Sequence, residues 1–181
     1  MIEITSATQI DELLGQVDTA ARRTHDWLLA HAEDSIALFK AMKFDPVGRH
    51  PVEDRPLNII EQVNQTWTFT VALLATRQLL KLHPEAQGFK VAPGAHMSLP
   101  LDIMSIVPGL VGAETFAAVK PSSNNKLNKD LLKLSQHRET YRYVFMMCPD
   151  FRPGHHPKLD RCGVQVWAVE PDAAHVLTKL D

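Results

Sequence analysis

Two apolar stretches decide the predicted fold: Ser98-Leu-Pro-Leu-Asp-Ile-Met-Ser-Ile106 and Gly112-Ala-Glu-Thr-Phe-Ala-Ala-Val-Lys120. Short apolar runs bounded by Gly or Pro are typical of buried β-strands, and Pro108-Gly109 between them predicts a turn. Each stretch carries a single carboxylate, Asp102 in the first and Glu114 in the second. A carboxylate among apolar neighbours is costly unless it is paired, hydrogen-bonded or bound to a cation. We therefore expect the two acids to share a partner, and a divalent metal ion is one such partner.

The chain around these stretches alternates between helix and strand patterns. Three strands are expected at Gly88–Ala92, Ser98–Val107 and Leu110–Lys120, which read as a meander. A long helix should precede them and stop before His83-Pro84. Its expected buried stripe is Ile60, Val63, Trp67, Val71 and Leu74.

A second helix is expected after the meander, with Ser123-Asn124-Asn125 as its N-capping segment. Its apolar residues are Leu127, Leu131, Leu132 and Leu134. Strands at Tyr141–Met147 and Val164–Val169 and a helix from Pro171 to Lys179 should complete the chain. Both faces of the central strands are apolar, so the sheet should be covered on both sides.

The N-terminal third is expected to be a helical extension. Residues 7 to 42 have helical periodicity, with a cap expected at Asp18, and Pro46, Pro51 and Pro56 punctuate a polar connector. We therefore divide the chain into an N-terminal helical extension with its connector, 1–56, and a core, 57–181.

Composition restricts the class of protein. The 181 residues are 45% hydrophobic and 22% charged, with a formal net charge of −2, as in an ordinary globular domain. Two cysteines are too few for a disulfide scaffold, and no apolar run approaches the roughly 20 residues of a membrane span. The first residues lack the pattern of a secretory signal. These features predict a reduced, cytoplasmic protein without a membrane partner.

The order of these elements, with Glu61 on the first core helix, Asp102 on the second strand and Glu114 on the third, resembles the PD-(D/E)XK, or restriction-endonuclease-like, superfamily. The resemblance spans residues 57 to about 147. It implies an α/β fold with a central mixed sheet flanked by helices. It also implies that Asp102 and Glu114 hold magnesium, or manganese in its place, against a scissile phosphate, with Glu61 assisting. Magnesium takes oxygen ligands and often only one or two carboxylates, which suits this pair.

One position departs from the superfamily pattern. The lysine that usually follows the glutamate by two residues is replaced by Phe116. Lys120 shares strand parity with Glu114, but six residues put it roughly 20 Å along the strand. Lys126 is the better candidate, because it begins the second helix, where free backbone donors also favour a phosphate. The alternative is that Lys126 is a solvated lysine near a helix start.

A basic segment follows the acidic strands. From Lys120 to Arg142 there are six Lys or Arg residues against two acids, which favours nucleic acid as the partner. Asn125, Lys129 and Lys133 are the candidate nucleic-acid contacts. The alternative is that Lys126, Lys129 and Lys133 form the solvated face of an amphipathic helix.

Two further readings stay open for the acidic residues. Glu61, Gln65 and Thr68 form a polar row on one side of the first core helix, which is either part of the site or a solvated face. Asp102 and Glu114 are either metal ligands or strand carboxylates satisfied by internal partners.

A second constellation lies in the loop between the last two strands: Cys148, His155, His156 and Cys162. Two thiolates and two imidazoles can close a tetrahedral zinc site. The spacing matches no common zinc motif, and a cysteine at the end of an apolar strand often simply packs. A structural zinc is therefore not the expected reading.

The predicted function is metal-dependent hydrolysis of phosphodiester bonds in nucleic acid. The catalytic set is Asp102, Glu114, Lys126 and Glu61, with Asp102 and Glu114 as metal ligands. The alternative is a protein that keeps the nuclease fold without catalysis and binds nucleic acid or another protein. A weaker third reading is a metal-dependent hydrolase of a small phosphate ester. A homodimer is left open.

Overall fold

The meander expected from the two acidic stretches is present. In the computed structural model, which describes residues 1–31, 34–93 and 99–170, β4 (Phe89–Val91), β5 (Ile103–Ser105) and β6 (Val111–Ala117) are consecutive antiparallel neighbours. β6 then pairs in parallel with β7 (Tyr141–Met147), and β7 in parallel with β9 (Val164–Ala168). A parallel pair needs a crossover connection, and α4 (Lys126–Ser135) supplies it between β6 and β7. With α3 (Ile59–Leu82) in front, the predicted helix-strand-strand-strand-helix-strand order is confirmed.

The central sheet has seven strands in the order β1-β4-β5-β6-β7-β9-β8 and mixes parallel with antiparallel pairs. The edge strands are β1 (Ile2–Ile4) and β8 (Gly154–His155). Successive side chains of a strand point to opposite faces, so β7 places Tyr143 and Phe145 in one core cluster and Val144 and Met146 in the other. The predicted α/β fold with a sheet covered on both faces is confirmed.

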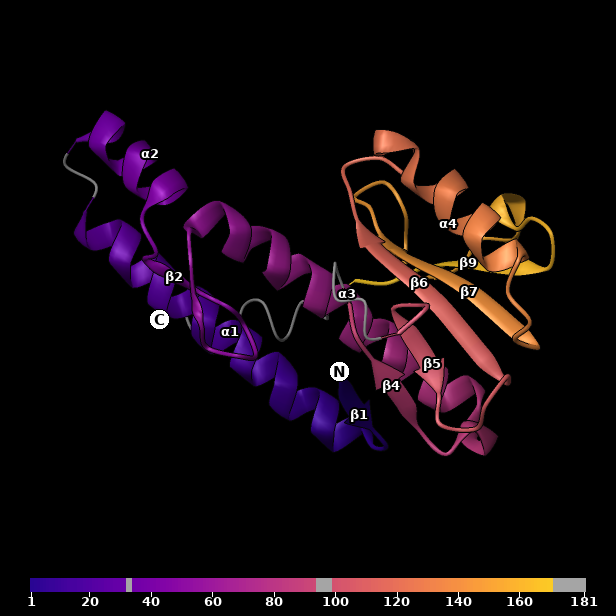
Figure 1. Ribbon diagram of the computed structural model, residues 1–181. Coiled ribbons are helices and arrows are strands. Elements are labelled where there is room, and N and C mark those ends of the chain that lie inside the picture. The colour runs from indigo at the N-terminus through magenta and orange to yellow at the C-terminus, as the bar shows by residue number, and fades with distance from the viewer. Residues whose placement is uncertain (32–33, 94–98, 171–181) are drawn as a thin grey trace.

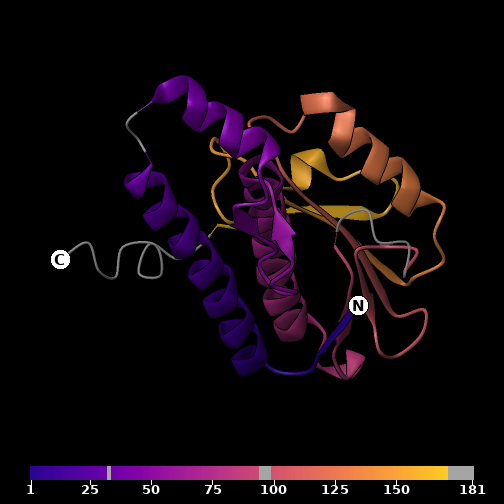
Figure 2. The same cartoon turned by 60° about the vertical axis from the view of Figure 1, so that its left-hand side comes forward.

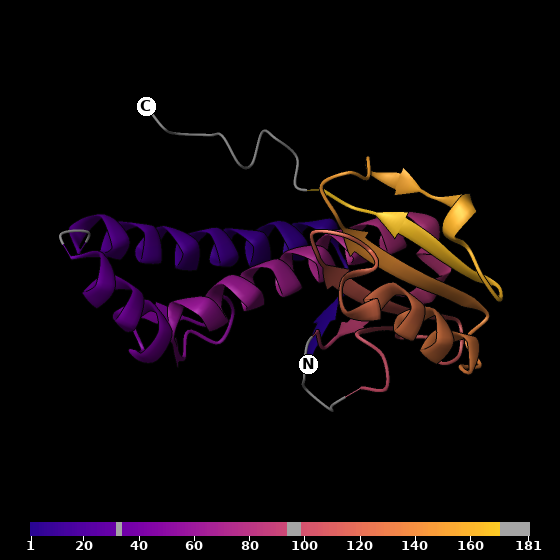
Figure 3. The ribbon, with the colours of Figure 1, turned by 90° about the horizontal axis from the view of Figure 1, so that it is seen from above.

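Helices from different parts of the chain cover the two faces. The C-terminal half of α3 packs on one face together with α1 (Ala7–Ala30), and α4 packs on the other (Figures 1 and 3). α4 buries Leu127, Leu131 and Leu134 against the sheet. These residues recur at steps of three or four, which explains the position of α4.

A helical arm projects from one side of the sheet, and Figure 2 shows it turned toward the viewer. It consists of α1, α2 (Ser35–Phe44), the N-terminal half of α3, and the small ribbon of β2 (Gly48–Arg49) and β3 (Pro56–Leu57). Gln62 of α3 ties the arm together. Its side-chain nitrogen donates to the carbonyl of Ala20, and its oxygen accepts from the Thr24 hydroxyl and the Arg49 backbone N–H. A buried amide with these three bonds fixes α1, β2 and α3 relative to one another.

The N-terminal segment differs from the sequence expectation in three respects. The expected helix 7–42 is two helices, because α1 ends at Ala30 and α2 begins at Ser35. Asp18 is no cap, since it lies inside α1 and pairs with Arg22 one turn later. Ile2–Ile4 forms strand β1, which pairs with β4, so this segment contributes to the same sheet as residues after 56. Ile4, Ile10 and Val17 accordingly belong to the core cluster that α3 lines.

The remaining boundaries shift by a few residues. α3 ends at Leu82 as expected, and β4, β6 and β9 lie within their predicted ranges. The strand expected at 98–107 is confined to Ile103–Ser105, so Asp102 precedes it by one residue. Three short 3₁₀ turns complete the described elements: Pro84–Ala86, Ser123–Asn125 and Pro157–Leu159. The helix expected at 171–179 lies outside the described residues. Among the described helices, none combines the length and apolar content needed to cross a bilayer.

Candidate active site

A pocket of about 500 Å³ lies at the carboxyl end of β6. Its walls come from the second half of β6, the 3₁₀ turn before α4, one face of α4 and the middle of α3. The residues that matter for its chemistry are Thr68, Asp102, Glu114, Asn124, Lys126 and Lys133. The carboxyl ends of strands are where open α/β sheets usually bind ligands.

Strand register brings the two acids together. Ile103 of β5 is opposite Ala113 of β6, so Asp102, one residue before β5, and Glu114, one residue after Ala113, lie near each other where this pairing ends. The negative charge of Glu114 accordingly contributes to raising the pKa of Asp102. Both carboxylates line this pocket, but each has its own partner within the protein, Thr115 for Asp102 and Lys133 for Glu114.

Thr115 holds Asp102 in place. Its backbone N–H and its hydroxyl both donate to Asp102 Oδ2, each at 2.9 Å. Burial raises the pKa of the Asp102 carboxyl, and the charge of Glu114 raises it further, whereas the two bonds from Thr115 and the charge of Lys126 act in the opposite direction. The net effect raises the pKa of Asp102, so its ionised form is less stable than that of a solvent-exposed aspartate. A cation placed beside it would relieve that imbalance.

Glu114 has a cationic partner of its own. Only 3% of the residue is exposed, and its Oε1 lies 2.6 Å from Nζ of Lys133 on α4. A buried carboxylate needs such a partner. Lys133 is less confined, because its side chain is 45% exposed and reaches the pocket from the rim.

Helical spacing explains how α4 faces the acids. Lys126, Asp130 and Lys133 are separated by four and three residues, so they form one stripe along the helix. Lys126 Nζ lies 2.7 Å from Asp130 Oδ1. Asp130 is 3% exposed, and its Oδ2 is buried with no hydrogen-bond partner in the described part of the chain. The site therefore contains three carboxylates against two ammonium groups.

The ionisation of the Lys126–Asp130 pair follows from burial and charge. Burial alone would lower the pKa of Lys126, but its bond to Asp130 and the charges of Asp130, Glu114 and Asp102 more than offset this and raise it. Burial also raises the pKa of Asp130, and the bond to Lys126 opposes that shift. Lys126 is therefore a permanent positive charge at neutral pH rather than a base.

The other predicted site residues lie elsewhere. Glu61 is exposed in the first turn of α3, two turns before Thr68, which at 1.5 Å per residue is about 10 Å along the helix. Lys129 is exposed on the outer side of α4. Asn125 stands at the N-cap of α4, but its side chain accepts from the side chain of Asn128 rather than from a backbone N–H. The structure thus brings Asp102, Glu114, Lys126 and Lys133 together in the pocket. Glu61, Asn125 and Lys129 lie outside it. Phe116, in the usual lysine position, packs in the core beneath α4 and lines the pocket.

The pocket suits a hard cation with few protein ligands. Both bonds from Thr115 reach Oδ2 of Asp102, and Lys133 contacts Oε1 of Glu114, so each acid has a second oxygen with which to bind. Among the described residues no group of three or more His, Cys, Asp or Glu side chains is placed to hold a metal. A two-carboxylate site with several waters is the arrangement that magnesium accepts and structural zinc does not.

The cysteines and histidines considered for zinc are engaged separately. Cys148 is buried in the core, and Cys162 is exposed in a left-handed turn. His155 Nε2 lies 2.8 Å from Asp160 Oδ2, and its ring stacks on Trp167. His156 Nε2 lies 2.9 Å from the carbonyl of Arg152.

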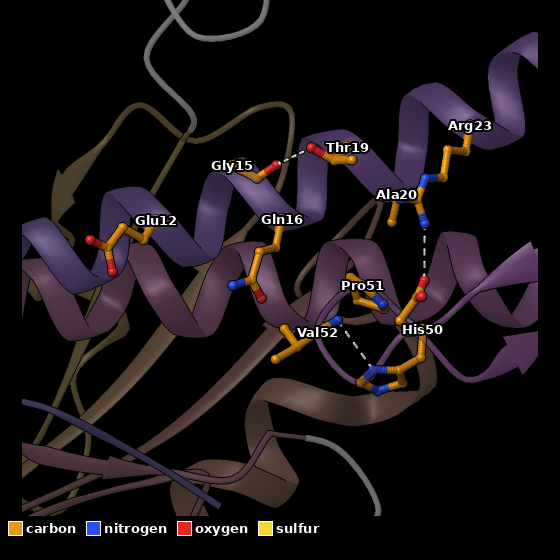
Figure 4. A pocket seen from close by; sticks show the side chains of 10 residues that line it. Glu12, Gly15, Gln16, Thr19, Ala20, Arg23, His50, Pro51 and Val52 are labelled. Carbon is orange, nitrogen blue, oxygen red and sulfur yellow. Dashed lines mark hydrogen bonds and ion pairs between the residues drawn. The ribbon is translucent and has the colours of Figure 1, made fainter.

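A second pocket, of about 610 Å³, lies between α1 and the β2–β3 connection (Figure 4). Arg23, Asp54 and His50 of this pocket have partners within the protein. Arg23 pairs with Asp54, and Nδ1 of the buried His50 accepts from the backbone N–H groups of Val52 and Glu53. Although this pocket is larger, its charges do not converge, and the pocket at β6 is the better candidate for chemistry.

The sequence did not predict three contacts of the acidic residues. These are the contact of Thr115 with Asp102, that of Asp130 with Lys126, and that of Lys133 with Glu114. The spacing of Lys126, Asp130 and Lys133 was visible as a helical stripe. The role of this stripe depends on which strand lies opposite α4, and local sequence spacing does not determine that.

No family model, curated protein or solved structure matches the chain, so comparison with known proteins does not identify its function.

Proposed function

We propose that this protein is a metal-dependent nuclease of restriction-endonuclease-like architecture. The observation that carries the proposal is the pocket lined by Asp102, just before β5, by Glu114 of the adjacent strand β6 and by Lys126 of the following helix. The element order from α3 to β7 supports it, since it is the order on which the resemblance to the superfamily rests.

Each residue has a role that its surroundings favour. Asp102 and Glu114 would hold the cation, which would supply Lewis-acid stabilisation of phosphate charge and activation of water. Lys126, held charged by Asp130, lies where it can stabilise the negative charge that develops on the phosphate. Thr115 orients Asp102 through its two hydrogen bonds. Glu61 has no part in this proposal, because it lies outside the pocket.

The start of α4 is the proposed contact for the nucleic-acid backbone. Asn124 and Asn125 adopt left-handed conformations with φ of 52° and 56°, and Asn124 lines the pocket just before the helix begins. Helix N-termini favour phosphate because their first N–H groups lack intrahelical partners. Asn125 and Lys129 lie on the adjoining surface and would contact a strand that enters the pocket.

A cleavage assay tests the proposal. Asp102→Ala and Glu114→Ala should each reduce magnesium-dependent cleavage of DNA or RNA by at least about 100-fold, because each removes a cation ligand. Glu61→Ala is the matched control, an exposed acid outside the pocket, and should cleave as the parent protein does. Unchanged cleavage by either pocket variant would refute the assignment.

The competing function is nucleic-acid binding without catalysis. Phe116 in the usual lysine position and the closed Glu114–Lys133 pair favour it. In that case binding should weaken steeply with salt, be indifferent to magnesium and survive in Asp102→Ala. The nuclease proposal instead predicts saturable magnesium binding that Asp102→Ala abolishes.

A further inference from the structure

The tip of the helical arm is unusually apolar. α2 contains ten residues, none of which is buried. Leu38 and Met42 are half-buried, yet Ile36 and Phe39 are 76% and 64% exposed. A helix with apolar residues all round is normally buried on all sides. Within the described chain, α2 therefore packs with only part of its apolar surface.

α3, which contacts α2, also exposes apolar side chains in its first turns. Ile60, Val63 and Trp67 recur at steps of three and four, and each is between 41% and 48% exposed. Together with Ile36, Phe39 and Phe44 they expose on the order of 600 Å² of apolar surface, taking 150–250 Å² for a whole aromatic side chain and somewhat less for an aliphatic one. A monomer's largest apolar patch is normally about 300–600 Å², and a stable interface buries about 800 Å² on each partner.

We propose that α2 and the first turns of α3 form the interface of a homodimer. A second copy fits because a two-fold interface pairs a surface with itself and needs only self-complementary chemistry. The charged residues within α2 are Lys40 and Lys43, whereas the first four turns of α3 carry only Glu61. Laying α2 of one copy over α3 of the other therefore sets opposite charges side by side around the apolar centre.

The interface also explains how α2 is stable. An isolated helix of ten residues is marginal in water, and its stability normally comes from packing an apolar face. Among the residues that the structure describes, the main packing partner of α2 is α3. The dimer supplies a second contact through apolar residues that do not line the pocket at β6, so the proposal does not rest on the proposed nuclease activity.

Sedimentation velocity on the full chain, over a dilution series, tests the proposal. The parent protein should sediment at twice the chain mass of 20.3 kDa, and Phe39→Glu should raise the dimer dissociation constant by at least about tenfold. Ile36→Glu is a second variant with the same expectation. Leu132→Glu is the matched control, since it places the same charge on an equally exposed apolar helix position of α4 and should leave the dimer intact.

Hydrogen exchange completes the test. Amide protection in α2 should fall on dilution of the parent protein and in Phe39→Glu, while far-UV circular dichroism shows that the variant is folded. A parent protein of single-chain mass at all concentrations would overturn the proposal. If α2 were then protected without any dependence on concentration, its cover would be another segment of the same chain.

Discussion

The Nζ atom of Lys133 lies 2.6 Å from Oε1 of Glu114, inside the pocket that Glu114 shares with Asp102. This ion pair neutralises a buried carboxylate, and it also occupies part of the space in which a cation would bind. Lys133 approaches from the solvent side, so its ammonium can withdraw into water when a metal arrives.

Lys133→Met should therefore tighten metal binding. Removing the competing ammonium is expected to lower the dissociation constant for Mn²⁺ by about tenfold, or 1.4 kcal/mol, in isothermal titration calorimetry. Without metal the variant should lose about 1–2 kcal/mol of folding stability, less than for a fully buried pair because Lys133 is half exposed. Lys129→Met, an exposed lysine on the same helix, should change neither quantity. Equal metal affinity in parent and Lys133→Met would show that Lys133 does not compete for the site.

Asp102→Asn should stabilise the fold at neutral pH. Burial and the charge of Glu114 raise the pKa of Asp102 above its ordinary value of 3.8, so the folded protein holds this proton more tightly than the unfolded chain. The corresponding stability is fully present below the ordinary value and is lost as pH rises through the folded-state value. Asp102→Asn carries no charge and so avoids this loss of stability at high pH, and its amide oxygen can still accept the hydrogen bonds from Thr115. The free energy of unfolding is expected to rise by about 0.5–2 kcal/mol at pH 7.

Urea denaturation of the Asp102→Asn variant from pH 4 to pH 7 provides the measurement. The stability advantage of the variant should grow with pH across this window. A variant that is less stable at pH 7 than the parent would mean that Asp102 has a cationic partner that the structure does not contain.

Asp130→Asn should shift the pH profile of cleavage, a prediction that rests on the proposed function. The bond from Asp130 is the main influence that raises the pKa of Lys126. Without that charge the burial of Lys126 dominates, its pKa falls, and the alkaline limb of kcat/KM moves to lower pH. Asp130→Glu should restore much of the original profile. An unchanged alkaline limb, with reduced rate at all pH values, would indicate that Asp130 acts only through folding.

Tyr143→Phe should destabilise the opposite end of the sheet. The Tyr143 hydroxyl lies 2.7 Å from Nε2 of His83, whose Nδ1 lies 2.9 Å from Glu85. Burial, with the charges of Tyr141 and Glu85, raises the pKa of Tyr143 to about 12. The Glu85 carboxylate can only accept, so Nδ1 of His83 donates to it, and Nε2 of the neutral ring accepts from the Tyr143 hydroxyl. Losing this donor leaves a buried ring nitrogen unsatisfied and should cost about 1–3 kcal/mol in urea denaturation. Tyr141→Phe, 42% exposed, is the control and should stay within about 0.5 kcal/mol.

The elements that the sequence predicted correctly are those with strong local patterns. α4 has apolar residues at helical spacing, α3 has a clear stop, and β6 and β7 are long apolar runs. The buried stripe predicted on α3 was wrong at Ile60, Val63 and Trp67, which are 41–48% exposed because the first half of α3 lies beyond the sheet. β1 was missed because three residues of strand have no pattern without their partner β4. The break between α1 and α2 was missed because both flanking segments have good helical periodicity.

For the site, the sequence identified which acids would converge but not what neutralises them. Asp102 and Glu114 stood out because each is a charge in an apolar run, and their shared pocket follows from the turn that joins β5 and β6. The contacts of Lys133 with Glu114 and of Thr115 with Asp102 depend on the tilt of α4 and on side-chain direction. Neither is encoded in local spacing.

Anomalous scattering from crystals grown with Mn²⁺ tests the central claim most directly, namely that Asp102 and Glu114 bind one cation between them. The account predicts an anomalous peak at coordinating distance, about 2.1 Å, from an oxygen of each carboxylate, with Lys133 displaced from Glu114. A map without a peak at either acid, in which Lys133 still contacts Glu114 and Thr115 still holds Asp102, would contradict it.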